Sequence, residues 1–179
     1  MGSGTTGVLT YQVPLCRSNS IFEPPAQTVR RRKSRECYAW GVGTFEYFDH
    51  AADVGIELTA SSLPDLFVTA ARALMEWMGP APDSPASRTE KVTVEADNLD
   101  ELLVRWLQEL LYLFHRCRCY WLEAGAVEVT DRTIAATIKG SPWNEESERV
   151  FQEVKAVTYH KVRVLERRGI WHARVILDI

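Results

Sequence analysis

Hydrophobic and polar residues begin to alternate near residue 44. The apolar positions that recur at every second residue are Phe45, Tyr47, Val54, Ile56 and Leu58. A period of two is typical of strands that bury one face. The sequence therefore predicts two short strands on either side of the polar segment at residues 49–53.

Two longer segments repeat their apolar residues with helical spacing. The first begins after Ser62, a common N-cap residue, and ends near Gly79. The second begins after Asn98, where Glu101 three residues later resembles a capping box. We predict that both helices are amphipathic and that the second buries the broader face. Its apolar residues are Leu99, Leu102, Leu103, Trp106, Leu107, Leu110, Leu111 and Phe114.

The rest of the folded part shows strand patterns. Strands are expected at residues 91–96, 127–129, 133–139, 150–157, 161–165 and 171–177. The sequence Arg167-Arg168-Gly169 is typical of a hairpin turn between the last two. Two helices and mainly antiparallel strands predict an α+β two-layer sandwich, with both helices on one face of the sheet.

Charge separates the first 43 residues from the remainder. Residues 1–43 hold six Lys or Arg against two Asp or Glu and include the cluster Arg30-Arg31-Arg32-Lys33, whereas residues 44–179 hold fifteen against twenty-two. We predict a disordered basic N-terminal extension at residues 1–43 and one folded acidic domain at residues 44–179. The basic cluster is interpreted as a solvated tail or as a contact with a partner or nucleic acid.

Composition also limits location and partners. The sequence has no apolar run long enough for a membrane span and no secretory signal pattern, and its four cysteines are poorly spaced for a disulfide framework. We therefore expect a cytoplasmic protein with reduced thiols and no membrane contact. Because phosphate contacts by cations dominate nucleic-acid affinity, an acidic domain is not expected to bind nucleic acid strongly on its own.

The end of the sequence predicts a metal site. Asp178 and the α-carboxylate of Ile179 are neighbouring oxygen anions that repel each other, and a divalent cation relieves that repulsion. Asp53 would add a third carboxylate, and such oxygen ligands suit Ca²⁺ or Mg²⁺. The alternative is that these carboxylates are simply solvated at the end of a strand.

Four other polar residues accompany the predicted site. His50 lies beside Asp53 in sequence, and Lys155, Tyr159 and His160 belong to a second polar segment. We predict that they hold the metal ligands in place or contact a partner. The alternatives are that the histidines are partly buried and bonded to main-chain carbonyls, and that the lysine forms a salt bridge.

Most enzyme classes lack support. The sequence contains no phosphate-binding P-loop, no glycine-rich dinucleotide turn and no recognisable nucleophile with its base. Zinc at His115, Cys117 and Cys119 is disfavoured because a helix would point Cys117 away from the other two. These absences count against most enzyme classes.

Three motifs in this order resemble the archease family. They are His50-Ala51-Ala52-Asp53, the segment Lys155-Ala156-Val157-Thr158-Tyr159-His160, and the final Asp178-Ile179. The resemblance covers about residues 44–179. Family members usually have Thr where Ala51 stands, which leaves the metal affinity open because a hydroxyl there could orient a ligand.

This resemblance implies a fold and a function. The implied fold is a two-layer sandwich built on a strand-helix-strand-strand module, known as SHS2. The implied function is to activate the guanylylated tRNA-splicing RNA ligase, which joins ends with a 3′-phosphate or 2′,3′-cyclic phosphate to a 5′-hydroxyl, by promoting guanylylation and multiple turnover. The implied metal ligands are Asp53, Asp178 and Ile179, with calcium as the usual ion and magnesium or manganese as alternatives.

Two other functions fit the same residues. One is a stand-alone metal-dependent phosphoester hydrolase that activates water at the oxygen ligands, with His50 or His160 as general base. The other is a chaperone-like adaptor module whose acidic surface binds a basic partner, with the metal incidental.

Overall fold

The computed structural model describes residues 43–50, 52–144 and 151–179. Most of the predicted extension at residues 1–43, including the basic cluster, lies outside them. Among the described residues, no helix is long and apolar enough to cross a membrane. In chain order the elements are β1 (Thr44–His50), β2 (Asp53–Ala60), α1 (Leu63–Met78), β3 (Arg88–Glu95), α2 (Leu99–Cys117), β4 (Cys119–Val129), β5 (Thr133–Pro142), β6 (Ala156–Arg167) and β7 (Ile170–Asp178).

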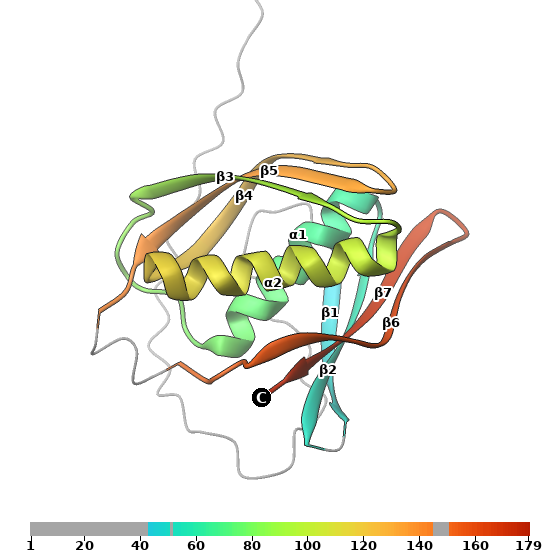
Figure 1. Ribbon diagram of the computed structural model, residues 1–179, viewed down its shortest axis with the longest axis horizontal. Coiled ribbons are helices and arrows are strands. Elements are labelled where there is room, and N and C mark those ends of the chain that lie inside the picture. Colours follow the sequence, from blue (N-terminus) through green and yellow to red (C-terminus); the bar gives the residue numbers. More distant parts are fainter. Residues whose placement is uncertain (1–42, 51, 145–150) are drawn as a thin grey trace, which may run out of the picture.

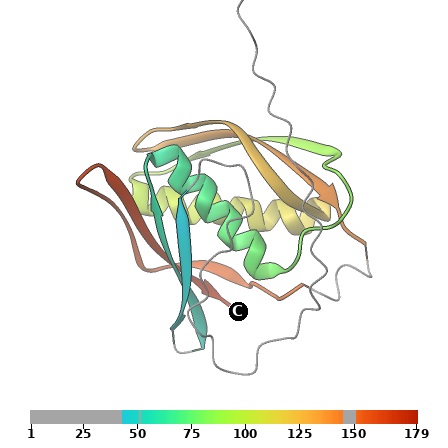
Figure 2. The same ribbon diagram turned by 180° about the vertical axis from the view of Figure 1, so that it is seen from behind.

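The strands form two antiparallel sheets. One has the order β1-β2-β7-β6 and the other the order β3-β5-β4. The helices lie between the sheets and contact strands of both (Figure 1). Seen from behind, α1 lies beside β2 and crosses α2 (Figure 2). The predicted α+β class with antiparallel strands and two helices is confirmed.

The arrangement goes beyond the expected single sheet because α2 is apolar over so much of its circumference. One sheet cannot cover such a face, and the two sheets together do. Nine of its residues are buried. They are Leu102, Leu103, Val104, Trp106, Leu107, Leu110, Leu111, Leu113 and Phe114.

Both predicted helix starts are confirmed by their caps. The Ser62 hydroxyl accepts a hydrogen bond from the Asp65 amide at 3.2 Å, and the Asn98 side-chain oxygen accepts one from the Glu101 amide at 3.0 Å. Each bond satisfies an amide that has no partner within the first helical turn. These polar side chains therefore fix where each helix begins.

Buried polar groups tie the helices to one another and to the first sheet. The indole of Trp106, which is fully buried, donates to the Phe67 carbonyl at 3.1 Å. The Tyr47 hydroxyl on β1 donates to the Ala73 carbonyl at 2.7 Å, and burial raises the pKa of Tyr47 well above its usual value. Because buried donors without partners are costly, these two bonds favour one packing of the layers.

The hairpin between the last two strands was predicted correctly, whereas the strand predicted at residues 127–129 begins earlier, at Cys119, and the one predicted at 150–157 begins later. Arg168 and Gly169 both have positive φ and join β6 to β7 in a two-residue turn, as predicted. The predicted strand at residues 150–157 is absent at 151–155, and β6 begins only at Ala156. In that segment Phe151 is partly buried against Phe114, with ring centroids 5.2 Å apart, so packing rather than sheet pairing accounts for its apolar character.

Candidate functional site

A row of polar residues crosses one end of the first sheet. His50 on β1 is paired with Asp53 on β2. The last pair between β2 and β7 is Val54 with Leu177, so the next residues along these strands, Asp53 and Asp178, lie opposite each other. Opposite residues in antiparallel strands share a face, with Cβ atoms about 4.5–5.5 Å apart. The pairing therefore brings together two of the three predicted metal ligands.

This row lies on the face of the sheet that points away from the helices. The neighbouring residues Val54 and Leu177 are buried in the core. Because side chains alternate between faces, Asp53 and Asp178 point the other way. Both aspartates are partly exposed. The two carboxylates are therefore accessible to solutes.

His50 connects the row to β6. Its Nδ1 atom lies 3.9 Å from a carboxylate oxygen of Asp53 and, although buried, has no hydrogen-bond partner among the residues that the structure describes. Its Nε2 atom lies 3.3 Å from the Lys161 ammonium nitrogen, and its ring centroid lies 5.5 Å from that of His160. A small shift of His50 would let Nδ1 bond to Asp53 and orient the carboxylate.

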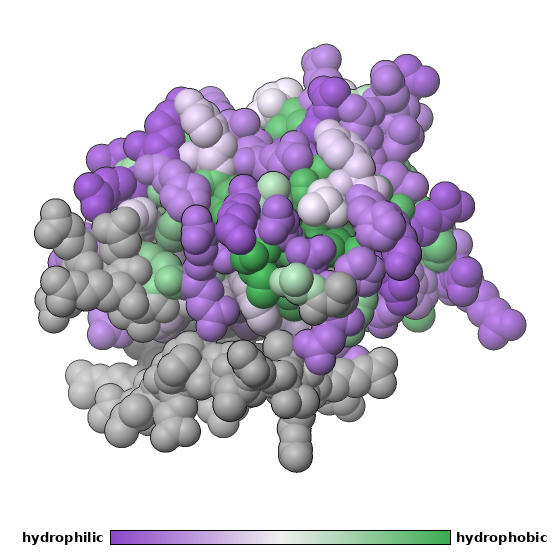
Figure 3. Space-filling view, turned by 60° about the horizontal axis from the view of Figure 1, so that its bottom comes forward, coloured by the Kyte–Doolittle hydropathy of each residue, from purple (hydrophilic) through white to green (hydrophobic). Residues whose placement is uncertain are grey.

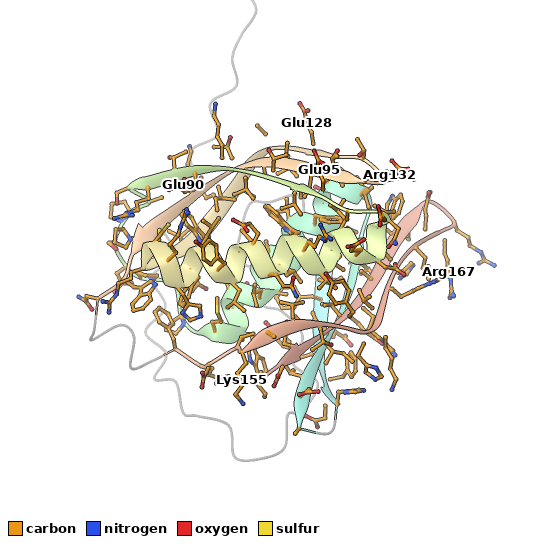
Figure 4. All side chains as sticks on the ribbon, viewed as in Figure 1. Glu90, Glu95, Glu128, Arg132, Lys155 and Arg167 are labelled. Carbon is orange, nitrogen blue, oxygen red and sulfur yellow. The ribbon has the colours of Figure 1, made fainter. Side chains whose placement is uncertain are left out.

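Lys155 holds the end of β7. Its main-chain amide donates to the Asp178 carbonyl at 2.8 Å, and its ammonium group donates to the main-chain oxygen of Ile179, also at 2.8 Å. Figure 4 places Lys155 just before β6, close to the chain end. The lysine therefore fixes the position of Ile179 and also competes with a metal ion for its oxygen.

A bulge in β6 separates residues that are adjacent in sequence. The register against β7 shifts between Thr158 and Arg163, and Lys161 has a positive φ of 54°. Bulges redirect side chains in this way. Here the bulge brings His160 and Lys161 to His50. Sequence reasoning missed Lys161, although its position directly after the Lys155–His160 motif was a usable signal.

The structure places Tyr159 elsewhere. Its side chain is 53% exposed and lines an open groove of about 700 Å³ along α2. A hydrogen bond to Tyr159 is the largest cause of the raised pKa of Arg105 on that helix. Tyr159 therefore does not join the row, whereas His50, Asp53, Lys155, His160, Asp178 and Ile179 all lie at the same end of the first sheet.

The oxygen atoms of Asp53, Asp178 and Ile179 are of the kind that bind a hard divalent cation, but they are too few to complete its coordination. Two facing carboxylates and a nearby main-chain oxygen are the ligand types that calcium, magnesium and manganese prefer. Within residues 43–50, 52–144 and 151–179, however, no three His, Cys, Asp or Glu side chains gather closely enough to hold a metal alone. Any ion here would therefore need main-chain oxygen or water as well. Ala51, the departure from the motif, lies outside the described residues.

Comparison with known proteins identifies the family. The model of the archease protein family matches residues 45–179. The chain belongs to the archease family. Archeases from Methanothermobacter thermautotrophicus and Sulfolobus acidocaldarius are 31% and 32% identical to it over 138 and 141 residues. In both cases the alignment covers 75% of this chain and 98% of the relative.

Solved structures support the archease fold. A solution structure of a Methanobacterium thermoautotrophicum protein, 32% identical, matches 75% of this chain and 98% of its own with a TM-score of 0.59. A crystal structure of a Thermotoga maritima archease, described there as a possible chaperone, matches 74% of this chain and 94% of its own at 15% identity and a TM-score of 0.51. The second match, at this identity, concerns the fold alone.

Proposed function

We propose that this chain is a cytoplasmic protein cofactor of an RNA ligase. The ligase is the guanylylated tRNA-splicing enzyme that joins 3′-phosphate or 2′,3′-cyclic phosphate ends to 5′-hydroxyl ends. The chain would promote guanylylation of the ligase and so allow multiple turnover. The observation that supports this most is the facing pair Asp53 and Asp178, which two archease motifs far apart in sequence contribute to one face.

Each residue of the row has a role in this proposal. Asp53, Asp178 and the main-chain oxygen of Ile179 would hold a divalent cation, with calcium first and magnesium or manganese as alternatives. When bound, the ion supplies positive charge at the surface that faces the ligase. Lys155 positions the chain end beside Asp178, and His50 would orient the Asp53 carboxylate after a small shift that brings its Nδ1 atom within hydrogen-bond distance.

The chain itself is proposed not to be an enzyme. The carboxylates are partly exposed on the outer face of the sheet, and neither aspartate lines the pocket to which Tyr159 contributes. A hydrolase needs a general base and a site that holds its substrate around the reacting bond. The row therefore suits a docking surface with a metal better than a catalytic cleft.

A ligase turnover assay tests the proposal. Purified cognate ligase is mixed with RNA ends in excess, with and without this protein, and the products per ligase molecule are counted. We expect stimulation by the parent and a fall to the ligase-alone level for the Asp53→Asn, Asp178→Asn double variant, because both anionic ligands are lost. Asp83→Asn, the same chemical change at an exposed loop residue, should stimulate like the parent.

Three results would contradict the proposal. Full stimulation by the double variant would show that the carboxylates are not needed. Phosphoester hydrolysis by the chain without ligase would favour the hydrolase. Stimulation that survives a chelator would favour an adaptor in which the metal is incidental.

A further inference from the structure

One hairpin of the folded part has a net positive charge, whereas the rest is net negative. The hairpin of β6 and β7, residues 156–178, holds five Lys or Arg against two Asp or Glu. The other residues from 44 to 179 hold ten against twenty. A polyanion is therefore repelled by most of the domain and attracted to this hairpin. The five cations are Lys161, Arg163, Arg167, Arg168 and Arg174.

The register arranges several of these cations on the outer face. Ala173 and Val175 are buried, so alternation places Arg174 on the face away from the helices, and Arg163 is directly opposite it. Arg167, paired with Ile170, lies on the same face two steps further along. Because a strand rises about 3.3 Å per residue, Arg163 and Arg167 are about 13 Å apart along this face.

The arginines in the middle of the hairpin have acidic neighbours. Arg163 lies 3.7 Å from Asp100, whose carboxylate also accepts the Val164 amide, and Arg174 pairs with Glu57. These contacts offset the repulsion that two opposed like charges produce. They also tie the hairpin to α2 and β2, so the hairpin is held in a defined direction.

The arginines at the tip are free to bind a ligand. Arg167 and Arg168 are exposed, and neither has an ion-pair partner within the part of the chain that the structure describes. The tip projects beyond the body of the domain, with Arg167 pointing outward (Figure 4). A guanidinium group binds phosphate oxygens through two parallel hydrogen bonds, which makes arginine well suited to phosphate contacts.

We propose that the β6–β7 hairpin binds the phosphate backbone of an RNA strand, with Arg167 and Arg168 as the contacts at its tip. The choice of RNA rests on the proposed function. Figure 3 shows a mostly hydrophilic surface with some hydrophobic areas on the side of the molecule that faces down in Figure 1. About ten residues of strand separate the tip from Asp178, so the hairpin would guide an RNA strand over roughly 30 Å.

Fluorescence anisotropy with a short, labelled single-stranded RNA tests the inference on the full chain without ligase. The test variant is Arg167→Gln, Arg168→Asn. Because Asn-Gly is a favoured pair for this turn, the variant keeps the hairpin while removing both charges. We expect affinity to fall about tenfold at about 0.1 M salt, and the slope of log affinity against log salt to fall by about 1.4, for two lost phosphate contacts.

Two variants with the same loss of charge serve as controls. Arg88→Gln, Lys139→Gln removes two exposed cations from the other sheet, and Arg31→Gln, Arg32→Gln removes two from the basic cluster of the N-terminal segment. In each control background, the Arg167→Gln, Arg168→Asn change should still lower RNA affinity by the same factor as in the parent. An equal loss of affinity in the Arg88, Lys139 variant would show a general charge effect and overturn the inference.

Other outcomes overturn the inference in recognisable ways. If the hairpin variant binds RNA with the same affinity and the same dependence on salt as the parent, the tip does not contact phosphate. Unchanged RNA binding with weakened ligase binding would show that the hairpin is a protein contact. Neither result affects the proposed function, which the ligase assay tests separately through the Asp53 and Asp178 variants.

Discussion

The two ends of the β6–β7 hairpin hold their charges in opposite ways. Near Asp178, the charged groups lie within a few ångströms of one another and of the sheet, with Lys155 bonded to the last two residues. At the tip, Arg167 and Arg168 are both exposed, and Arg167 points outward (Figure 4). The first end has charges fixed in a small volume, and the second has charges that are free to adapt.

Binding at the first end is expected to depend on the positions of individual atoms, and binding at the tip on the number of charges. At the first end, the position of each oxygen depends on strand pairing, on Lys155 and on the contact of His50 with Lys161. Substitutions there are expected to alter specific binding of an ion. At the tip, a phosphate contact depends mainly on the number of cations and on salt.

The largest effect is expected on metal binding at the first end. Asp53→Asn, Asp178→Asn removes both carboxylate charges and should lower affinity for Ca²⁺ by more than about 100-fold, beyond the 10–100-fold typical of residues that only support a ligand. Isothermal titration of the purified chain with CaCl₂ measures this. Arg167→Gln, Arg168→Asn should bind Ca²⁺ like the parent, and equal Ca²⁺ affinity in the carboxylate variant would exclude the site.

A smaller effect is expected on the stability of the sheet at Gly55, two residues from Asp53. A Cβ at Gly55 would lie 2.0 Å from the nearest ring atom of Phe48, which packs over this glycine on the outer face and under Arg174. Gly55→Ala must displace that ring and should cost about 1–3 kcal/mol of unfolding free energy. Urea unfolding measures the loss.

Gly125→Ala is the matched control, because its nearest contact would be an ordinary 3.9 Å. It should leave stability unchanged or slightly raised. Adding Phe48→Ala to Gly55→Ala should bring the cost of the glycine substitution close to zero. If Gly55→Ala and Gly125→Ala unfold at the same urea concentration, Phe48 does not restrain this end of the sheet.

Local features of the fold could be predicted from sequence. Ser62 and Asn98 cap their helices because a side-chain oxygen meets an amide two or three residues away, and Arg168-Gly169 turns because glycine tolerates positive φ. All of these depend on neighbours in the chain. Long-range pairing does not, so the division of the strands into two sheets was not predictable from their patterns.

The candidate site was predictable only in its residue types. That Asp53 and Asp178 lie opposite each other depends on β2 pairing with β7, which no local pattern encodes. The separation of Tyr159 from His160 depends on the bulge in β6, where the period of two is interrupted. Tyr159 and His160 are neighbours in one sequence motif and were predicted to act together, but in the structure they lie on different surfaces.

The smallest effect is expected at the tip, where stability and charge can be changed separately. Arg168 has a φ of 54°, a conformation that costs most residues about 1 kcal/mol but suits asparagine. Arg168→Asn should therefore raise the free energy of unfolding by about 0.5–1 kcal/mol while removing one cation. Arg167→Asn removes the same charge without positive φ, so urea unfolding should show no gain in stability for it. Equal stability of the two variants would mean that relief of charge repulsion, rather than the turn, determines how the tip responds.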